Sequence, residues 1–147
     1  MTPSPASCDP STTLRLVAGL MTDHDCAAIP VTESGRLVGI ITDRDITMRG
    51  VALHDDVASL ETRECMSSPV IAIGPDEPIE KAVELLTENA IHHLPVIDDK
   101  GMLLGILAQS DLGRRMTNRD FGQLARSTSI RMKYAYRRAE AITRREH

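Results

Sequence analysis

Apolar residues recur every three or four positions in two stretches of the chain, and this period predicts two amphipathic helices. The clearer stretch covers residues 77–89, where Asp76 is a candidate N-cap and Pro78 falls in the first turn. Its apolar stripe consists of Ile79, Val83, Leu86 and Ala90. The other stretch lies nearer the N-terminus, with Ser11 or Thr12 as its cap and a stripe of Leu14, Ala18 and Met21. Each helix is expected to bury one face.

After each predicted helix, a short apolar run containing a proline leads through a Gly-containing turn into a second apolar run. Two such runs predict a β-hairpin, with the proline at a strand start or edge where its missing N–H is tolerated. Residues 70–73 predict a further strand before the second helix, and residues 5–8 are its weaker counterpart. Each unit therefore consists of strand, helix, strand and strand, and then a helix that begins at Asp45 or Asp111.

The two hairpins have nearly the same sequence. The segments Ile29-Pro30-Val31 and Gly39-Ile40-Ile41-Thr42-Asp43-Arg44-Asp45 recur as Leu94-Pro95-Val96 and Gly105-Ile106-Leu107-Ala108-Gln109-Ser110-Asp111. Pro30 and Pro95 lie 65 positions apart, and Asp45 and Asp111 lie 66 apart, so the copies stay in register apart from one inserted residue. This duplication predicts two like units stacked on each other, because one unit is too small to bury its apolar face alone.

Composition narrows the class of protein. A length of 147 residues with 41% hydrophobic content fits one compact domain or two half-domains that share an interface. No apolar run approaches the roughly 18 residues of a membrane span, and no signal peptide is evident, so we expect a cytoplasmic protein without membrane contact.

Cys8, Cys26 and Cys65 lack the spacing of a zinc or redox motif and are expected to be small buried or half-buried residues.

Charge is distributed unevenly along the chain. Residues 1–113 carry seven Lys/Arg against eighteen Asp/Glu, whereas residues 114–147 carry ten Lys/Arg against three acids. Apolar residues of the tail, from Phe121 to Ile142, fall near helical spacing. We therefore expect a basic helical tail, which is either a solvated helix against the acidic body or a surface for a partner subunit, an acidic protein or nucleic acid.

Taken together, the double pattern resembles a tandem pair of cystathionine β-synthase (CBS) domains, often called a Bateman module. Three motifs carry the resemblance over about residues 1–116. They are Gly-x-x-Thr-x-x-Asp at 39–45, Cys65-Met66-Ser67-Ser68-Pro69-Val70, and Ile91-His92-His93-Leu94-Pro95-Val96. The resemblance implies an α+β fold of two β-α-β-β-α repeats packed with pseudo-two-fold symmetry. We place the repeats at 1–58 and 59–116, and the tail at 117–147. A flat two-fold homodimer is also implied, and such closed dimers are common in general.

The chemistry of Thr42 and Asp45 also indicates a ligand. An ionised carboxylate accepts two neighbouring hydroxyls well, such as those of a ribose. A Thr hydroxyl three residues earlier, with free backbone N–H groups at a helix start, would form a corner for an anion such as phosphate. The alternative is that Asp45 is only an N-cap and Thr42 only a strand residue. The complete motif inside a duplicated hairpin favours nucleotide contact.

In the resembled family, the site lies in the cleft between the repeats. Carried over to this chain, the nucleotide-binding residues are Ile40, Thr42, Arg44, Asp45, Val70, Ile71, His92, His93 and Pro95. If the two histidines contact phosphate, affinity rises as pH falls towards the range where imidazole protonates. A weaker second site would use Ala27, Ala28, Ile106, Ser110 and Asp111. It is less complete, because Ala108 replaces the threonine.

No spacing in the sequence indicates a catalytic group, a resident cofactor or a metal site, so we expect a binding module that is not an enzyme. The main hypothesis is a sensor for an adenosine-containing ligand such as AMP, ADP or ATP, which signals to an unknown effector protein. The alternative is a dimeric interaction module with a non-functional cleft, whose basic tail binds a protein or nucleic acid.

Overall fold

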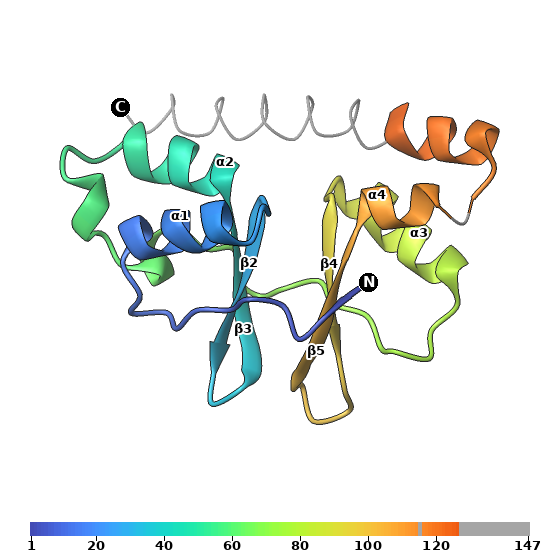
Figure 1. Cartoon of the computed structure of the whole chain (residues 1–147), viewed down its shortest axis with the longest axis horizontal. Coiled ribbons are helices and arrows are strands. Elements are labelled where there is room, and N and C mark those ends of the chain that lie inside the picture. The colour runs from blue at the N-terminus through green and yellow to red at the C-terminus, as the bar shows by residue number, and fades with distance from the viewer. Residues whose placement is uncertain (115, 127–147) are drawn as a thin grey trace. The chain divides into compact units, whose positions relative to one another are not determined.

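The fold was obtained as a computed structural model of the whole chain, which describes residues 1–114 and 116–126. The elements, shown in Figure 1, are β1 (Thr2–Pro3), α1 (Leu14–Asp23), β2 (Ala28–Glu33), β3 (Arg36–Thr42), α2 (Asp43–Asp45), a π-helix (Ile46–Val51), two 3-10 turns (Val57–Ser59 and Thr62–Glu64), α3 (Ile79–Asn89), β4 (His93–Ile97), β5 (Leu103–Ala108) and α4 (Gln109–Gly113). Residues 118–126 are helical. The expected α+β class is confirmed. The rest of the predicted basic tail lies outside the described residues.

The strands form two small sheets. One has the order β1-β5-β4, and the other is the β2–β3 hairpin. In the hairpin, Ala28 faces Thr42 and Ile29 faces Ile41, and the register shifts between Val31 and Thr32. The predicted hairpins are therefore present in both copies.

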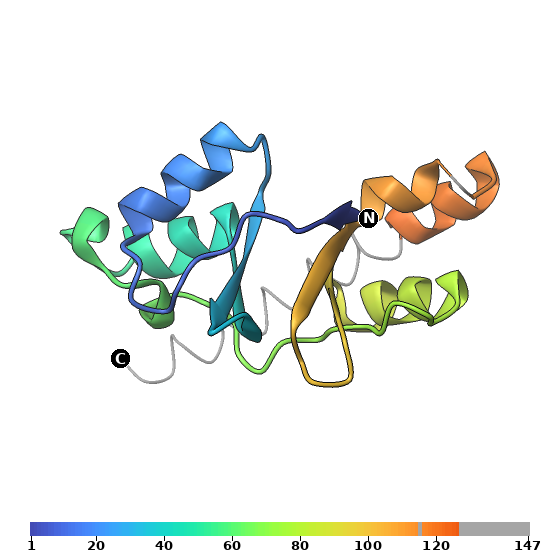
Figure 2. The same ribbon diagram turned by 60° about the horizontal axis from the view of Figure 1, so that its bottom comes forward.

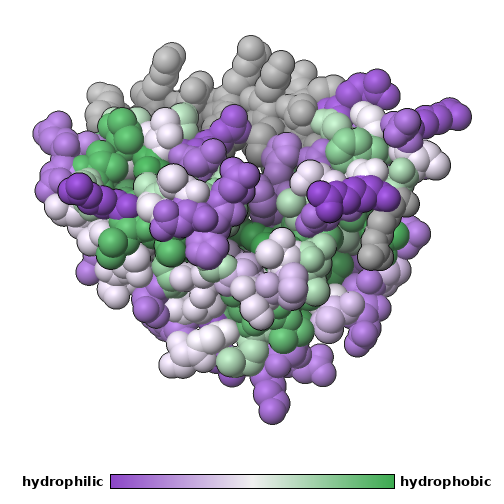
Figure 3. Space-filling view, viewed as in Figure 1, coloured by the Kyte–Doolittle hydropathy of each residue, from purple (hydrophilic) through white to green (hydrophobic). Residues whose placement is uncertain are grey.

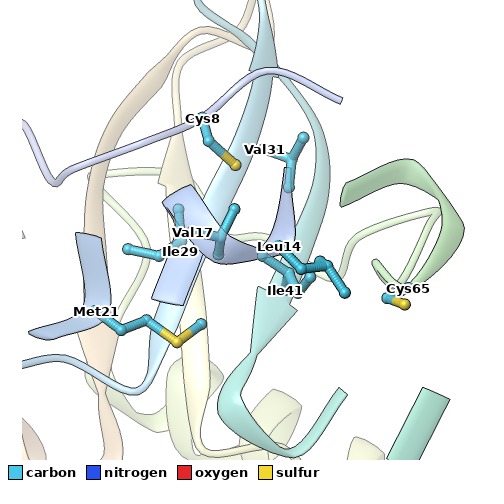
Figure 4. Packing of buried hydrophobic residues seen from close by; sticks show 8 residues of the cluster. All are labelled: Cys8, Leu14, Val17, Met21, Ile29, Val31, Ile41 and Cys65. Carbon is cyan, nitrogen blue, oxygen red and sulfur yellow. The ribbon is translucent and has the colours of Figure 1, made fainter. Parts of the chain in front are cut away.

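Helix α1 packs on the β2–β3 hairpin. Leu14, Val17 and Met21 are its buried residues, and they join Ile29, Val31 and Ile41 in one apolar cluster (Figure 4). Both ribbon views show α1 and α2 on the same side of the hairpin (Figures 1 and 2). The predicted stripe was wrong at Ala18, which is exposed because the helix turns Val17 towards the sheet. The N-cap is Thr13, one residue after the predicted Thr12.

Helix α3 begins at Ile79, close to the predicted start, but Asp76 does not cap it. The N-cap is Pro78, which has no side-chain acceptor. The helix ends at Asn89, and its C-cap is Ala90, whose left-handed φ of 53° turns the chain away from the helix. Ala82 and Leu86 are its buried residues.

The strand predicted at residues 70–73 is reduced to one bridge. Ile73 pairs with Val96 in parallel, and its N–H donates to Pro95 O at 3.0 Å. Cys8, 65 positions earlier, makes the same contact with Val31, and its N–H donates to Pro30 O at 3.1 Å. The duplication in sequence is therefore repeated in the hydrogen bonds, although each first strand is too short to form a ladder.

The described residues form two compact units. The first unit comprises Thr2–Pro75 and Pro95–Ile106; the second comprises Met1, Asp76–Leu94 and the described residues from Leu107 onward. The first unit contains the cluster of Figure 4. Among the described residues of the second unit, the buried apolar ones are Ala82, Leu86, Leu94, Leu112 and Leu124. The repeat boundaries at residues 58 and 116 stay predictions.

The cysteines are buried to the extent expected from the sequence. Cys8 and Cys65 are buried, Cys26 is half-buried, and all three are free thiols. Burial is the main cause that raises the pKa of each thiol, so they are less acidic than an exposed cysteine. Among the described residues, no group of His, Cys, Asp and Glu side chains could hold a metal ion. No helix in the described part of the chain is long and apolar enough to cross a bilayer.

Candidate functional site

The Gly-x-x-Thr-x-x-Asp motif lies where β3 ends and α2 begins. Thr42 is the last strand residue and the N-cap of the helix, and Asp45 is the third helical residue. Asp45 Oδ2 accepts hydrogen bonds from Thr42 N and Thr42 Oγ1, each at 2.9 Å. In return Thr42 Oγ1 accepts from Asp45 N at 3.2 Å. This reciprocal capping box fixes the carboxylate on the strand end.

The sequence predicted free backbone N–H groups at this corner, and that expectation was wrong. Asp43 N donates to Ala27 O at 3.1 Å, and Arg44 N donates to Asp43 Oδ1 at 2.7 Å. Together with the N–H groups of Thr42 and Asp45, four consecutive donors are thus used within the chain. An anion at this corner would have to displace one of these bonds or rely on side chains.

Asp45 is buried, with 9% of the residue exposed, and its two oxygens differ in their partners. Oδ2 takes both bonds from Thr42, whereas Oδ1 lies 3.5 Å from Arg49 Nη1. This contact is at the long end of the ion-pair range, so Oδ1 has acceptor capacity left for a hydroxyl group. The alternative that Asp45 is the N-cap was wrong, because Thr42 is the N-cap of α2 and Asp45 is its third residue. The motif does form a capping box, and it leaves one carboxylate oxygen of Asp45 able to accept.

Besides β2, residues 66–68 also pair with β3. Ser67 N donates to Ile40 O at 2.8 Å, Ile40 N donates to Ser67 O at 3.1 Å, and Ser68 Oγ donates to Val38 O at 3.0 Å. Gly39 allows this approach, since a Cβ atom there would collide with Met66 Sδ. The N-terminal Thr2–Pro3 pairs in the matching way with Ile106 and Gly105 of β5.

Of the predicted nucleotide-binding residues, seven belong to the first compact unit: Ile40, Thr42, Arg44, Asp45, Val70, Ile71 and Pro95. Arg44 and Ile71 are exposed, and Ile40 and Val70 are half-buried. Pro95 is fully buried, and its carbonyl accepts from Ile73 N. Pro95 therefore supports the strand that precedes the second helix and offers almost no surface to a ligand.

His92 and His93 belong to the second compact unit. Both are half-buried; His92 O accepts from Gln109 N at 2.8 Å, and His93 begins β4. The pairing of these histidines with Thr42 and Asp45 stays a prediction.

The predicted second site is divided in the same way. Ala27, Ala28 and Ile106 belong to the first unit, and Ser110 and Asp111 to the second. Asp111 Oδ2 accepts from Ala108 N at 3.0 Å and lies 3.4 Å from the Met1 amino group. Because Ala108 has no hydroxyl, only half of the Thr42 arrangement forms here. Burial raises the pKa of Asp111, but the Ala108 N–H and the Met1 ammonium outweigh it and leave the pKa below its ordinary value.

The structure shows two further features that the sequence analysis did not identify. One is Arg49, whose position four residues after Asp45 was the only available signal. The other is an open pocket of about 390 Å³ at the end of α1. It is lined by Met21, Thr22, Asp25, Cys26, Ala27 and Asp43. Asp25 there has a left-handed φ of 48°, which no pattern in the sequence predicted.

The sequence is similar to a known family model and to proteins of other organisms. The family model described as CBS domain matches residues 1–51 and 62–118. The CBS domain-containing protein YhcV of Bacillus subtilis is 37% identical over 123 residues, which cover 83% of this chain and 86% of YhcV. An uncharacterised protein of Methanopyrus kandleri, MK0525, is 33% identical over 104 residues, which cover 70% of this chain and 53% of that protein.

A solved structure with a ligand is also similar. The CBS domain pair of protein MJ0100, in complex with 5′-methylthioadenosine and S-adenosyl-L-methionine, is 28% identical with a TM-score of 0.68. The match covers 75% of this chain and 86% of that one.

Proposed function

Because the chain belongs to the CBS domain family and carries two of its repeats, we propose that it is a non-catalytic regulatory module that binds an adenosine-containing ligand and signals to an effector protein. The observation that carries the proposal is the carboxylate of Asp45. Thr42 holds it through Oδ2, and Oδ1 keeps acceptor capacity. A fixed carboxylate of this kind suits the hydroxyl pair of a ribose. The adenosine compounds bound by the MJ0100 pair support the same ligand class.

Three groups of residues complete the proposed site. Asp45 takes the sugar hydroxyls, and the apolar surface of Ile40, Val70 and Ile71 takes the purine. Phosphate is met by the side chains of Arg44, His92 and His93, because the backbone N–H groups at the corner already have partners. AMP, ADP and ATP are the first candidates. Signalling requires that the ligand binds two arrangements of the chain with different affinity.

Isothermal titration with AMP, ADP, ATP, S-adenosylmethionine and NAD tests this function. We expect one of these ligands to bind, and Asp45→Asn to weaken its binding at least tenfold, or about 1.4 kcal/mol. Asp99→Asn is the matched control, since Asp99 is an exposed carboxylate in the turn before β5. Absence of heat with all five ligands, or equal affinity in Asp45→Asn, would contradict the proposal.

We further propose that the protein acts in the cytoplasm as a homodimer. Four exposed apolar side chains come from α1, from the π-helix that follows α2 and from the turn after that helix, and we refer to them as the apolar patch: Leu16, Met48, Val51 and Leu53. Their exposed fractions are 62%, 42%, 60% and 65%. Figure 3 shows hydrophobic surface at the upper left, in the region of these two helices. Burial of such a patch against a second copy would remove it from water.

The charge of the tail favours a second candidate function. Residues 114–147 carry ten Lys/Arg against three acids, so the chain could be an interaction module that binds nucleic acid or an acidic protein through this segment. In that case DNA or RNA binding weakens steeply with added salt and is lost when the chain is truncated after Met116.

A further inference from the structure

We propose that Arg49 is a positioning residue of the ligand site, which holds the segment 65–67 against the carboxylate of Asp45. The inference rests on the proposed adenosine-binding function and assigns a role within it to a residue outside the Gly-x-x-Thr-x-x-Asp motif.

One nitrogen atom of Arg49, Nη1, contacts both the segment 65–67 and the carboxylate of Asp45. Nη1 donates to Cys65 O at 2.9 Å, to Met66 O at 3.2 Å and to Ser67 Oγ at 3.2 Å. The same atom lies 3.5 Å from Asp45 Oδ1. Two hydrogens on one nitrogen cannot serve four acceptors equally, and the carboxylate is the most distant of them. Arg49 therefore holds the segment firmly and Asp45 loosely, so that Oδ1 can take another donor.

These contacts close a ring of interactions within the first compact unit. Ile40 and Ser67 exchange backbone hydrogen bonds, β3 continues from Ile40 to Thr42, and Thr42 fixes Asp45. Arg49 joins Asp45 back to Ser67. Without the guanidinium, the segment would keep its two backbone hydrogen bonds with Ile40, and the neighbouring Ser68 would keep its bond to Val38 O. The segment would lose the link through Arg49 to Asp45.

The segment also leads directly to the proposed purine contacts. Val70 and Ile71 follow Ser67 by three and four residues, so the position of Ser67 limits how far they can lie from Asp45. A nucleoside needs its sugar and its base sites at a fixed separation. Arg49 supplies this separation, because its planar charged group can bind several carbonyl oxygens and a carboxylate together.

The test compares Arg49→Met with Arg49→Lys and with Arg63→Met as the control. Arg63 lies two residues before Cys65 and pairs with Glu61 at 2.7 Å on the surface, so its loss should change nothing. We expect Arg49→Met to bind the best adenosine ligand about tenfold more weakly, and Arg49→Lys to recover part of this loss. Titrations are run at a temperature where every variant is folded.

Two further readouts separate positioning from other roles. Amide hydrogen exchange of Ile40 and Ser67 should become faster in Arg49→Met. The 2′-deoxy form of the ligand should lose affinity by the same factor as the ribo form, because Thr42 still holds the sugar-binding carboxylate. A selective loss for the ribo form would instead mean that Arg49 orients Asp45, and this would overturn the proposal.

The remaining outcomes are also decisive. Equal affinity in the wild type and Arg49→Met overturns the role of Arg49 while the proposed function stands. Weaker binding with unchanged exchange at Ile40 and Ser67 overturns positioning in favour of direct ligand contact. If the wild type binds no adenosine ligand, the proposed function fails and the role of Arg49 fails with it.

Discussion

Asp45 and Asp111 stand at matching positions in the two copies, yet the structure gives them different partners. Asp45 accepts from both the N–H and the hydroxyl of Thr42, whereas Ala108 offers Asp111 its N–H alone and the Met1 amino group is the second partner. One side chain causes the difference, because alanine has no donor to offer. The sequence correctly identified which copy keeps the threonine, but the internal use of the neighbouring N–H groups became evident only from the folded backbone.

The partners of Asp111 lead to a prediction about acid stability. Although burial raises the pKa of Asp111, the Ala108 N–H and the Met1 ammonium bring it below its ordinary value of 3.8. A lowered pKa in the folded state stabilises the fold at higher pH, and this contribution is lost as pH falls through the folded pKa. We expect Asp111→Asn to reduce the free energy of unfolding by about 0.5–1 kcal/mol at pH 7.

Urea denaturation at several pH values between 7 and 2 checks this expectation. The difference between Asp111→Asn and the wild type should shrink as pH falls below 3.8, the ordinary pKa of the group. Asp99→Asn, on an exposed turn, should show a smaller effect throughout. A difference for Asp111→Asn that is independent of pH would show that the charge of the carboxylate does not matter.

At the scale of elements, the close packing of residues 66–68 on β3 requires a glycine at position 39. Gly39 faces Met66, whose Sδ occupies the space that a Cβ atom would need. The neighbouring residues Ile40 and Ser67 are paired through their backbones, so this contact lies beside the ring that includes Arg49. Gly19 in α1 has nothing within 4 Å of its Cβ position. Replacing each of the two glycines by alanine is therefore expected to change the free energy of unfolding in opposite directions.

We expect Gly39→Ala to lower the free energy of unfolding by about 1–3 kcal/mol, because the added methyl group overpacks the contact with Met66. Gly19→Ala should raise it by about 0.5–1 kcal/mol, because alanine favours the helix. Chemical denaturation of both variants provides the measurement. Combining Gly39→Ala with Met66→Ala should recover part of the loss; a fully additive double variant would show that Met66 is not the obstacle.

At the scale of the whole molecule, the apolar patch gives a prediction about assembly. Val51 and Leu53 are both more than half exposed, and a charged residue there would prevent burial against a second copy. We expect the wild type to be a dimer and Val51→Glu/Leu53→Glu to be a monomer in sedimentation or light scattering. Leu104→Glu is the control, since Leu104 is an exposed apolar residue of β5 outside the patch. A wild-type monomer, or a double variant that still dimerises, would contradict the role of the patch.

Sequence by itself determined the class of fold, the duplication and the Thr42 and Asp45 motif. These features depend on local periodicity and on spacing, which the order of residues contains directly. The first strand of each copy could not be predicted well, because Cys8 and Ile73 pair at single positions with strands distant in the sequence. Only the tertiary structure brought Arg49 to the segment 65–67 and withdrew Pro95 from solvent. Both results depend on packing between segments far apart in the chain, and local patterns carry no information about such contacts.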